Sequence, residues 1–249
     1  MTPKDKYRQL CKNEKTIPIF SKDWWLDADC GEDNWDVLIV EKGGEIAASM
    51  PIYIKRKYGI KYITQPILSQ TSGIHIIYPE NQKYERRLSY EKEVMNEIID
   101  QMEELDVAYY QQNFHYSVTN WLPFYWRGFL QTTRYTYVIE DLRDLDKVYM
   151  DFSNNVRRRI KKASKIVSIK DNLSIEEFYN INTMTFDRQN LDIPYSLESL
   201  TRLDNSCIKH NCREIFYAID ENNVIHGALY IVWDDNSTYG LMAGANPKY

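Results

Sequence analysis

Cysteine is scarce in this chain, and its placement argues against a metal centre. The 249 residues include four cysteines, at positions 11, 30, 207 and 212. Cys207 and Cys212 lie five residues apart with His210 between them, but no second pair of ligands accompanies them. A zinc site is therefore not predicted. We expect no bound metal, and free thiols in a reducing cytoplasm.

Signatures of several protein classes are also missing. No Ser-His-Asp, HExxH or Walker-type pattern is present, so hydrolase, zinc-protease and NTPase functions have no support. Residues 1–8 lack the apolar core of a signal peptide. Two uncharged stretches, 62–79 and 107–126, approach the length of a membrane span, but both carry Gln, His and Pro. We therefore expect no transmembrane segment.

An excess of positive charge is missing as well. The formal net charge is −5, with 17 basic against 20 acidic residues up to Glu140 and 14 against 16 after it. Neither half is a basic domain, so we do not expect binding to bulk DNA or RNA. Tyrosine, by contrast, is abundant at 20 residues. Aromatic side chains with polar tips often line clefts for sugars, peptides or bases, although most serve as core residues.

One run of residues departs from the acidic balance. Between Val156 and Lys165, six of ten residues are basic, and Ser153 or Asn154 precedes the run as a helix N-cap. Apolar residues recur at helical spacing, at positions 156, 160, 163 and 167. This pattern predicts a helix with one packed side and one cationic side. The cationic side is a candidate phosphate or carboxylate site, with Arg157, Arg158 and Lys161 as its residues. The alternative is a solvated face that pairs with nearby acids.

Periodicity and turn residues predict a mixed α/β chain. Helices are expected at 4–14, 22–30 (capped by Ser21), 82–105, 145–165, 174–187 (with the capping box Ser174–Glu177) and 196–210. Strands are expected at 35–41, 45–54, 60–64, 74–78, 107–112, 131–140, 167–170, 214–220, 224–233 and 238–243. In both halves, two helices precede a hairpin.

The two hairpins also match in sequence. Sliding the chain on itself by 179 positions places Gly43-Gly44 on Asn222-Asn223, and Ile46 on Ile225. We interpret the match as a duplication, with a first domain at residues 1–140 and a second at 141–249.

The duplicated unit resembles the GNAT acyltransferase fold, and the whole chain resembles the Fem-type transferases. The residues that carry the resemblance are Phe152–Lys165, Phe178–Arg188 and Tyr239–Tyr249. The resemblance implies tandem GNAT-like domains with mixed, largely antiparallel sheets flanked by helices. It also implies transfer of an acyl or aminoacyl group to an amine on a cell-envelope glycan or peptide precursor. The donor would be aminoacyl-tRNA or acyl-CoA, with no tightly bound cofactor, and the acceptor end of a charged tRNA would be a partner.

Two departures from the family pattern matter. An acyl-CoA-binding GNAT domain holds the pyrophosphate with a glycine-rich loop and a helix N-terminus, but residues 79–87 contain no glycine. This argues against CoA binding in the first repeat. In the second repeat, the sequence ends at Tyr249, where the equivalent loop and helix should follow. We therefore expect an incomplete second domain.

The segment 111–128 is the most unusual stretch chemically. It follows a predicted strand, so it should emerge at the sheet edge where α/β folds bind ligands. The candidate acceptor-binding residues here are Gln112, Asn113, Trp121 and Arg127, and His115 is the candidate base. The alternative is a packed loop, because a lone histidine more often makes structural hydrogen bonds.

Three further residues are candidates for substrate binding. Arg134 and Tyr135 alternate along the predicted strand 131–140, and an inward Arg134 would need an anionic partner. Arg188 ends a predicted helix in a polar cluster and could face the same cleft. A different class of function is also open: a non-catalytic domain that binds an anionic glycan or nucleotide sugar.

Overall fold

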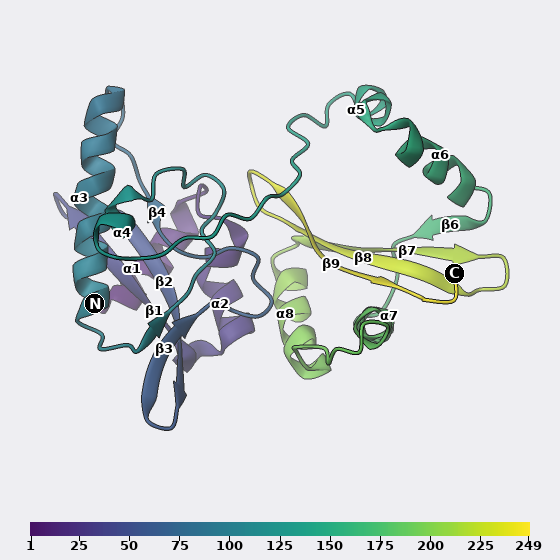
Figure 1. The fold of residues 1–249 in the computed structure, drawn as a ribbon, viewed down its shortest axis with the longest axis horizontal. Helices are drawn as coiled ribbons and strands as arrows, with labels where there is room; N and C mark the ends of the chain where they lie inside the picture. The colour runs from purple at the N-terminus through teal and green to yellow at the C-terminus, as the bar shows by residue number, and fades with distance from the viewer. The chain divides into compact units, whose positions relative to one another are not determined.

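The computed structural model describes residues 1–249, which divide into two compact units (Figure 1). Unit 1 comprises residues 1–130, 193–213 and 231–241, and unit 2 comprises residues 131–192, 214–230 and 242–249. Neither unit is continuous in sequence. The chain has the expected mixed α/β architecture, in which sheets are flanked by helices. The predicted division into repeats at residue 140 stays a prediction.

The sheet of unit 1 is built on the predicted hairpin. Its strands are β1 (Trp35–Lys42), β2 (Glu45–Lys57), β3 (Ile60–Thr64), β4 (His75–Ile76) and β5 (Tyr109–Tyr110). The order is β1-β2-β3-β5, and β4 pairs with the first half of β2. Lys42 pairs with Glu45 across Gly43 and Gly44, whose φ angles are 61° and 89°. A two-residue turn with two positive φ angles favours glycine.

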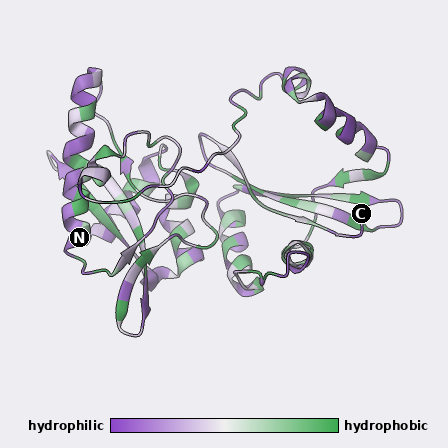
Figure 2. Cartoon of the chain, in the orientation of Figure 1, coloured by the Kyte–Doolittle hydropathy of each residue, from purple (hydrophilic) through white to green (hydrophobic).

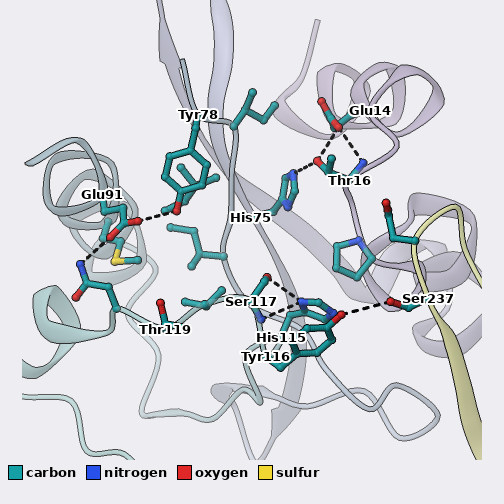
Figure 3. Close-up of a pocket in the computed structure, with 18 of the residues that line it drawn as sticks. Glu14, Thr16, His75, Tyr78, Glu91, His115, Tyr116, Ser117, Thr119 and Ser237 are labelled. Atoms are coloured by element: carbon teal, nitrogen blue, oxygen red, sulfur yellow. Dashed lines mark hydrogen bonds between the residues drawn. The ribbon is translucent and has the colours of Figure 1, made fainter. Parts of the chain in front are cut away.

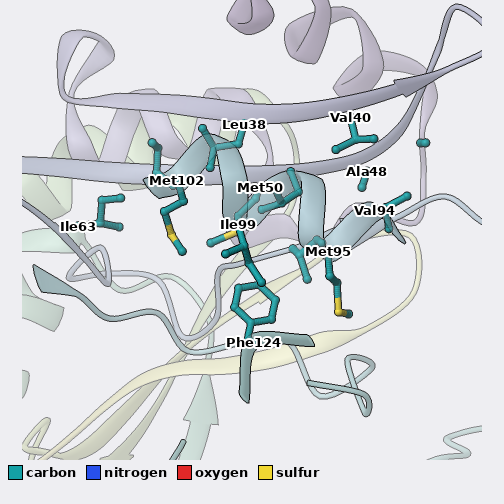
Figure 4. Packing of buried hydrophobic residues seen from close by; sticks show 14 residues of the cluster. Leu38, Val40, Ala48, Met50, Ile63, Val94, Met95, Ile99, Met102 and Phe124 are labelled. Atoms are coloured by element: carbon teal, nitrogen blue, oxygen red, sulfur yellow. The ribbon is translucent and has the colours of Figure 1, made fainter. Parts of the chain in front are cut away.

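Helices cover both faces of this sheet. They are α1 (Pro3–Asn13), α2 (Asp23–Cys30), α3 (Tyr84–Glu103) and α4 (Leu122–Trp126), with 3₁₀ turns at Ile19–Ser21 and Glu32–Asn34. Helix α8 (Leu197–Lys209) packs on α2. Figure 4 shows α3 and Phe124 of α4 packed on one face, against residues such as Leu38, Met50 and Ile63. Residues of α1 and α2 pack on the other face, around Trp35 and Val37.

The predicted start of α2 is wrong by one residue. Ser21 is buried in the preceding 3₁₀ turn, and Lys22 occupies the N-cap position without a capping side-chain bond. The backbone carbonyl of Lys22 accepts from the amides of Trp25 and Leu26, so the first turn begins there.

The remaining elements are centred on a second sheet. They are α5 (Leu145–Asp151), α6 (Asn154–Ala163), β6 (Val167–Lys170), α7 (Ile175–Asp187), β7 (Arg213–Asp220), β8 (Ile225–Trp233) and β9 (Thr238–Ala245). The strand order is β6-β7-β8-β9. The predicted capping box of α7, Ser174 with Glu177, is confirmed.

Helix α7 packs closely on the strands of unit 2. The rings of Phe178 and Tyr230 meet edge to face at 5.5 Å, and Asn182 Nδ2 donates to the carbonyl of Ala243 at 2.7 Å. A Cβ atom on Gly244 would lie 2.7 Å from the backbone of Ile181, so this approach requires glycine. Close packing thus fixes the helix against β9.

The predicted helix 145–165 is two helices. The break falls at Phe152 and Ser153, and the Ser153 hydroxyl accepts from the amide of Val156 as the expected N-cap. The predicted packed side of α6 is wrong, because this helix buries no residue and Val156 and Ile160 are each 42% exposed. Figure 2 shows α6 as mostly hydrophilic.

The predicted strand 131–140 is also wrong. The segment has no regular structure, and Arg134, Tyr135 and Tyr137 are all exposed. Its alternating β-branched and aromatic residues suit a pleated sheet, but no neighbouring strand supplies hydrogen bonds. Arg134 and Tyr135 therefore do not occupy opposite faces of a sheet.

The order of elements α1-α2-β1-β2-β3 recurs as α7-α8-β7-β8-β9. The two hairpin turns differ in detail. Gly43 and Gly44 close the first, whereas Asp220 N donates to the carbonyl of Val224 in the second, with a positive φ at Asn223. The duplication itself stays a prediction.

Candidate functional site

A cavity of about 510 Å³ lies within unit 1. Its walls come from the turn after α1, from β4, from the first turns of α3, from the loop 115–120 and from the turn 234–239 (Figure 3). These segments are far apart in sequence, and hydroxyl, amide, imidazole and carboxyl groups line the space together with three tyrosines. Such a lining suits a polar organic ligand with several hydrogen-bonding groups.

Gln112 and Asn113 position the loop that carries His115. Gln112 Nε2 donates to Pro51 O and to Ser72 Oγ, both at 2.7 Å, and the amide of Asn113 donates to Gln65 Oε1 at 2.9 Å. These two residues support the site and are not among the residues that line the cavity.

Gly73 allows the same loop to approach. Its φ is +100°, and an added Cβ atom would lie 2.3 Å from the ring of Phe114. A side chain at this position would therefore meet both backbone strain and an overlap with the ring.

His115, the candidate base, lines the cavity, and both of its ring nitrogens have partners. Nδ1 accepts from the amide of Ser117 at 3.3 Å and lies 2.8 Å from Ser117 Oγ. Nε2 lies 3.4 Å from the hydroxyl of Tyr239. Because Nδ1 accepts from a backbone amide, the neutral ring carries its proton on Nε2. Burial lowers the pKa of His115, which favours this neutral form.

Asp234 anchors the turn beside His115. Oδ1 accepts from the amides of Asn236 and Ser237, both at 2.9 Å, and Oδ2 accepts from the amide of Ile19 at 3.0 Å. The Tyr239 hydroxyl also donates to Oδ2, at 3.4 Å. Burial is the main reason that the pKa of Tyr239 is raised, with the charge of Asp234 adding to it. The tyrosine therefore stays protonated and donates.

Glu91 closes the opposite side of the cavity. This carboxylate of α3 is 6% exposed, and it accepts from Tyr78 at 2.8 Å, from Asn120 at 2.8 Å and from Arg87 at 3.3 Å. The guanidinium of Arg87 also lies 3.9 Å from the centre of the Tyr78 ring. Three donors compensate this buried charge, as a buried carboxylate requires.

A second histidine, which the sequence did not single out, lies between these groups. His75 of β4 is held by pairing with Ser49 of β2, and its Nε2 lies 3.1 Å from Thr16 Oγ1. The Thr16 hydroxyl donates to Glu14 Oε1 at 2.6 Å, and the Thr16 amide donates to the same oxygen at 2.9 Å. The sequence could not predict the contact between His75 and Thr16, because Glu14 and Thr16 lie about sixty residues before this short strand.

Carboxylates outnumber cationic groups in the lining of the cavity. Glu14, Glu91 and Asp234 supply carboxylates, and Arg87 supplies the one guanidinium among the lining residues. Burial lowers the pKa of His75 to about 4, so this ring is neutral at pH 7. The balance is negative and disfavours a phosphate or carboxylate ligand in this space.

The other predicted site residues lie outside the cavity lining. Trp121 precedes α4 and packs edge to face on Tyr125. Arg127 binds Asp100 at 2.7 Å and Glu103 at 2.6 Å, so it ties α4 to α3. Its role in the structure is that of a bridge between two helices.

The predicted site residues of unit 2 lie in α6, at the end of α7 and in the segment 131–140. Arg157 donates to the carbonyl of Met150 at 2.9 Å and to Asn154, and Arg158 reaches Asn155 at 3.3 Å. Lys161 is exposed in the last turn of α6, and Arg188 is exposed at the C-cap of α7. Arg134 and Tyr135 lie in the irregular segment described above.

Comparisons with known proteins identify a shared fold. No protein-family model matches the sequence, and no curated protein matches it either. Among solved structures, the crystal structure of FemX aligns over the whole of this chain and 80% of its own, with a TM-score of 0.65 and 10% sequence identity. No helix of the structure combines the length and apolar character needed to cross a membrane. The chain therefore has a FemX-like α/β fold.

Proposed function

We propose that this chain is a Fem-type transferase, which moves an acyl or aminoacyl group onto an amine of a cell-envelope glycan or peptide precursor. The observation that carries the proposal is the likeness to FemX over the entire chain. The sequence resemblance of the segments 152–165 and 178–188 to the same family supports it independently.

The cavity of unit 1 is the proposed acceptor site. Tyr78, Tyr116 and Tyr239 offer ring faces and hydroxyls, and Asn120 and Asn236 offer amides, which together suit a sugar or peptide. The negative balance is compatible with an amine and disfavours an anion. This charge argues against the rival function, a domain that binds an anionic glycan or nucleotide sugar, at this position.

The acyl donor is proposed to be aminoacyl-tRNA or acyl-CoA, bound only for the reaction. Either donor carries phosphates, and the guanidinium and ammonium groups of α6 supply the cations to bind them. Arg157, Arg158 and Lys161 are the proposed contacts. The residues before α3 contain no glycine loop, so the donor phosphates are not assigned there.

A transfer assay tests this function. The purified chain is incubated with aminoacyl-tRNA or acyl-CoA and a muropeptide or lysine-containing peptide, and mass spectrometry detects the acylated amine. Native mass spectrometry detects the donor complexes in parallel. Acylation of the peptide is the expected result. Binding of the acceptor without transfer from either donor would instead favour a non-catalytic binding domain.

A further inference from the structure

The protonation of His75 follows from its hydrogen bonds. Thr16 has one hydroxyl proton, and it is donated to Glu14 Oε1 at 2.6 Å. The Thr16 oxygen can therefore only accept from His75, at 3.1 Å, which places the proton of the neutral ring on Nε2. His75 Nδ1 then keeps its lone pair, because the hydrogen bond of this ring to Thr16 is made through Nε2. The residue lines the cavity (Figure 3).

His115, Glu91 and Asp234 already take part in hydrogen bonds with the protein. His115 accepts from Ser117 through Nδ1 and reaches Tyr239 through Nε2. Glu91 accepts three hydrogen bonds, and Asp234 accepts from three amides and one hydroxyl. Neither nitrogen of His115 can take a ligand proton without losing a hydrogen-bond partner within the protein. Among the imidazole nitrogens of the cavity, His75 Nδ1 can accept a proton without such a loss.

We propose that His75 Nδ1 is the group that accepts a proton from the acceptor amine, and that Thr16 and Glu14 are its positioning residues. The proposal rests on the proposed function. It replaces His115, which the sequence suggested, with a residue whose free lone pair faces the ligand space.

The amine nitrogen attacks the acyl carbon of an ester or thioester, a nitrogen–carbon bond forms, and the carbon–oxygen or carbon–sulfur bond breaks. The proton of the attacking nitrogen passes to Nδ1, and the leaving alcohol or thiol takes a proton from the imidazolium. No oxidant or further reactant is needed.

The groups around His75 act on its protonation in opposite directions. The ring is neutral at pH 7, which is the form that accepts a proton. Lys22 and His115 oppose the protonated form, whereas Glu14 favours it, through Thr16. Burial would raise the pKa of Glu14, but the hydrogen bonds from Thr16 outweigh this effect and lower it, so the carboxylate stays ionised. An imidazolium formed at His75 would thus donate its Nε2–H to Thr16 Oγ1, whose own proton is donated to the ionised Glu14.

Kinetics of matched variants test the proposal. We expect His75→Gln to lower kcat by about 100-fold or more, the usual contribution of a positioned base. Thr16→Val should lower kcat about tenfold and shift the pH profile, and Thr16→Ser, which keeps the hydroxyl, should restore both. His210→Gln is the matched control, because the His210 ring stacks on Trp24 outside the cavity. The kcat of this variant should equal that of the wild type. Unchanged kcat in a folded His75→Gln protein, with transfer present in the wild type, would overturn the proposal and leave the proposed function intact.

Nitrogen NMR of the histidine rings provides a readout that does not need turnover. The expected spectrum at pH 7 shows neutral His75 with its proton on Nε2, and Thr16→Val should mix the two tautomers. Titration with Nα-acetyl-lysine methylamide should move the Nδ1 resonance of His75 more than either resonance of His115. A proton on Nδ1 in the free protein, or no response of His75 to the amine, would refute the assignment even if the wild type transferred no acyl group.

Discussion

Helices α3 and α6 look alike in sequence and differ in what they bury. Both alternate apolar and charged positions at helical spacing. Helix α3 buries six residues: Glu91, Val94, Met95, Ile98, Ile99 and Met102. Helix α6 buries none. An amphipathic pattern therefore defines a stripe on a helix, and a facing sheet or helix decides whether that stripe becomes part of a core.

The largest effect that would test this contrast is expected at Ile99. Its side chain is 0% exposed in the core of unit 1, so Ile99→Ala should lower the free energy of unfolding by about 2–5 kcal/mol. Ile160→Ala in α6, with 42% exposure, should change it by about 0.5 kcal/mol or less. Urea denaturation measures both. A loss at Ile160 as large as that at Ile99 would mean that α6 is packed in solution.

A second variant examines the polar side of α3. Glu91→Ala removes the acceptor of Tyr78 and Asn120, and leaving buried donors unpaired costs about 1–3 kcal/mol. Glu85→Ala, on the exposed first turn of the same helix, should cost a few tenths of a kcal/mol, about the size of a helix-dipole effect. Equal losses at the two positions would show that the Glu91 network does not hold the cavity wall.

The N-caps of α7 and α6 should also differ in their effect on stability. Ser174→Ala removes the capping box of α7, a helix packed on strands, and should cost about 1 kcal/mol of global stability. Ser153→Ala removes the cap of α6 and should leave the global transition almost unchanged, because α6 buries no residue. Faster hydrogen exchange at the Val156 amide is the expected local effect. A shifted global midpoint for Ser153→Ala would contradict the idea that α6 folds and frays locally.

The smallest effect on stability is expected at the cations of α6. Arg158→Ala combined with Lys161→Ala should change the unfolding free energy by no more than about 0.5 kcal/mol, because both side chains are exposed. The same pair should weaken binding of acyl-CoA or aminoacyl-tRNA and reduce its dependence on salt. Binding that is unchanged across a salt titration would leave α6 as a solvated helix.

Local features of the fold could be predicted from the sequence. The turn at Gly43 and Gly44, the capping box at Ser174 and the helix predicted at 82–105 each depend on residues close together in the chain, and all are confirmed. Short-range chemistry fixes these features.

Features that need a distant partner could not be predicted in the same way. Residues 131–140 have the alternation of a strand but no strand beside them. His75 and Glu14 meet through Thr16 only after β4 pairs with β2, and Asp234 reaches the cavity from the far end of the chain. No periodicity within a window of residues encodes such contacts, so the sequence singled out His115 as a candidate and not His75.

The discontinuity of unit 1 has a consequence for synthesis on the ribosome. Asp234 Oδ2 accepts from the amide of Ile19 across 215 residues, and Gln70 donates to the carbonyl of Gly240 across 170. The cavity therefore cannot be completed until residues 234–240 have left the exit tunnel. Strands β1 to β4 emerge long before these residues and lack part of their final contacts in the meantime. The ligand site of a nascent chain would thus form only after the separate segments of unit 1 have all emerged.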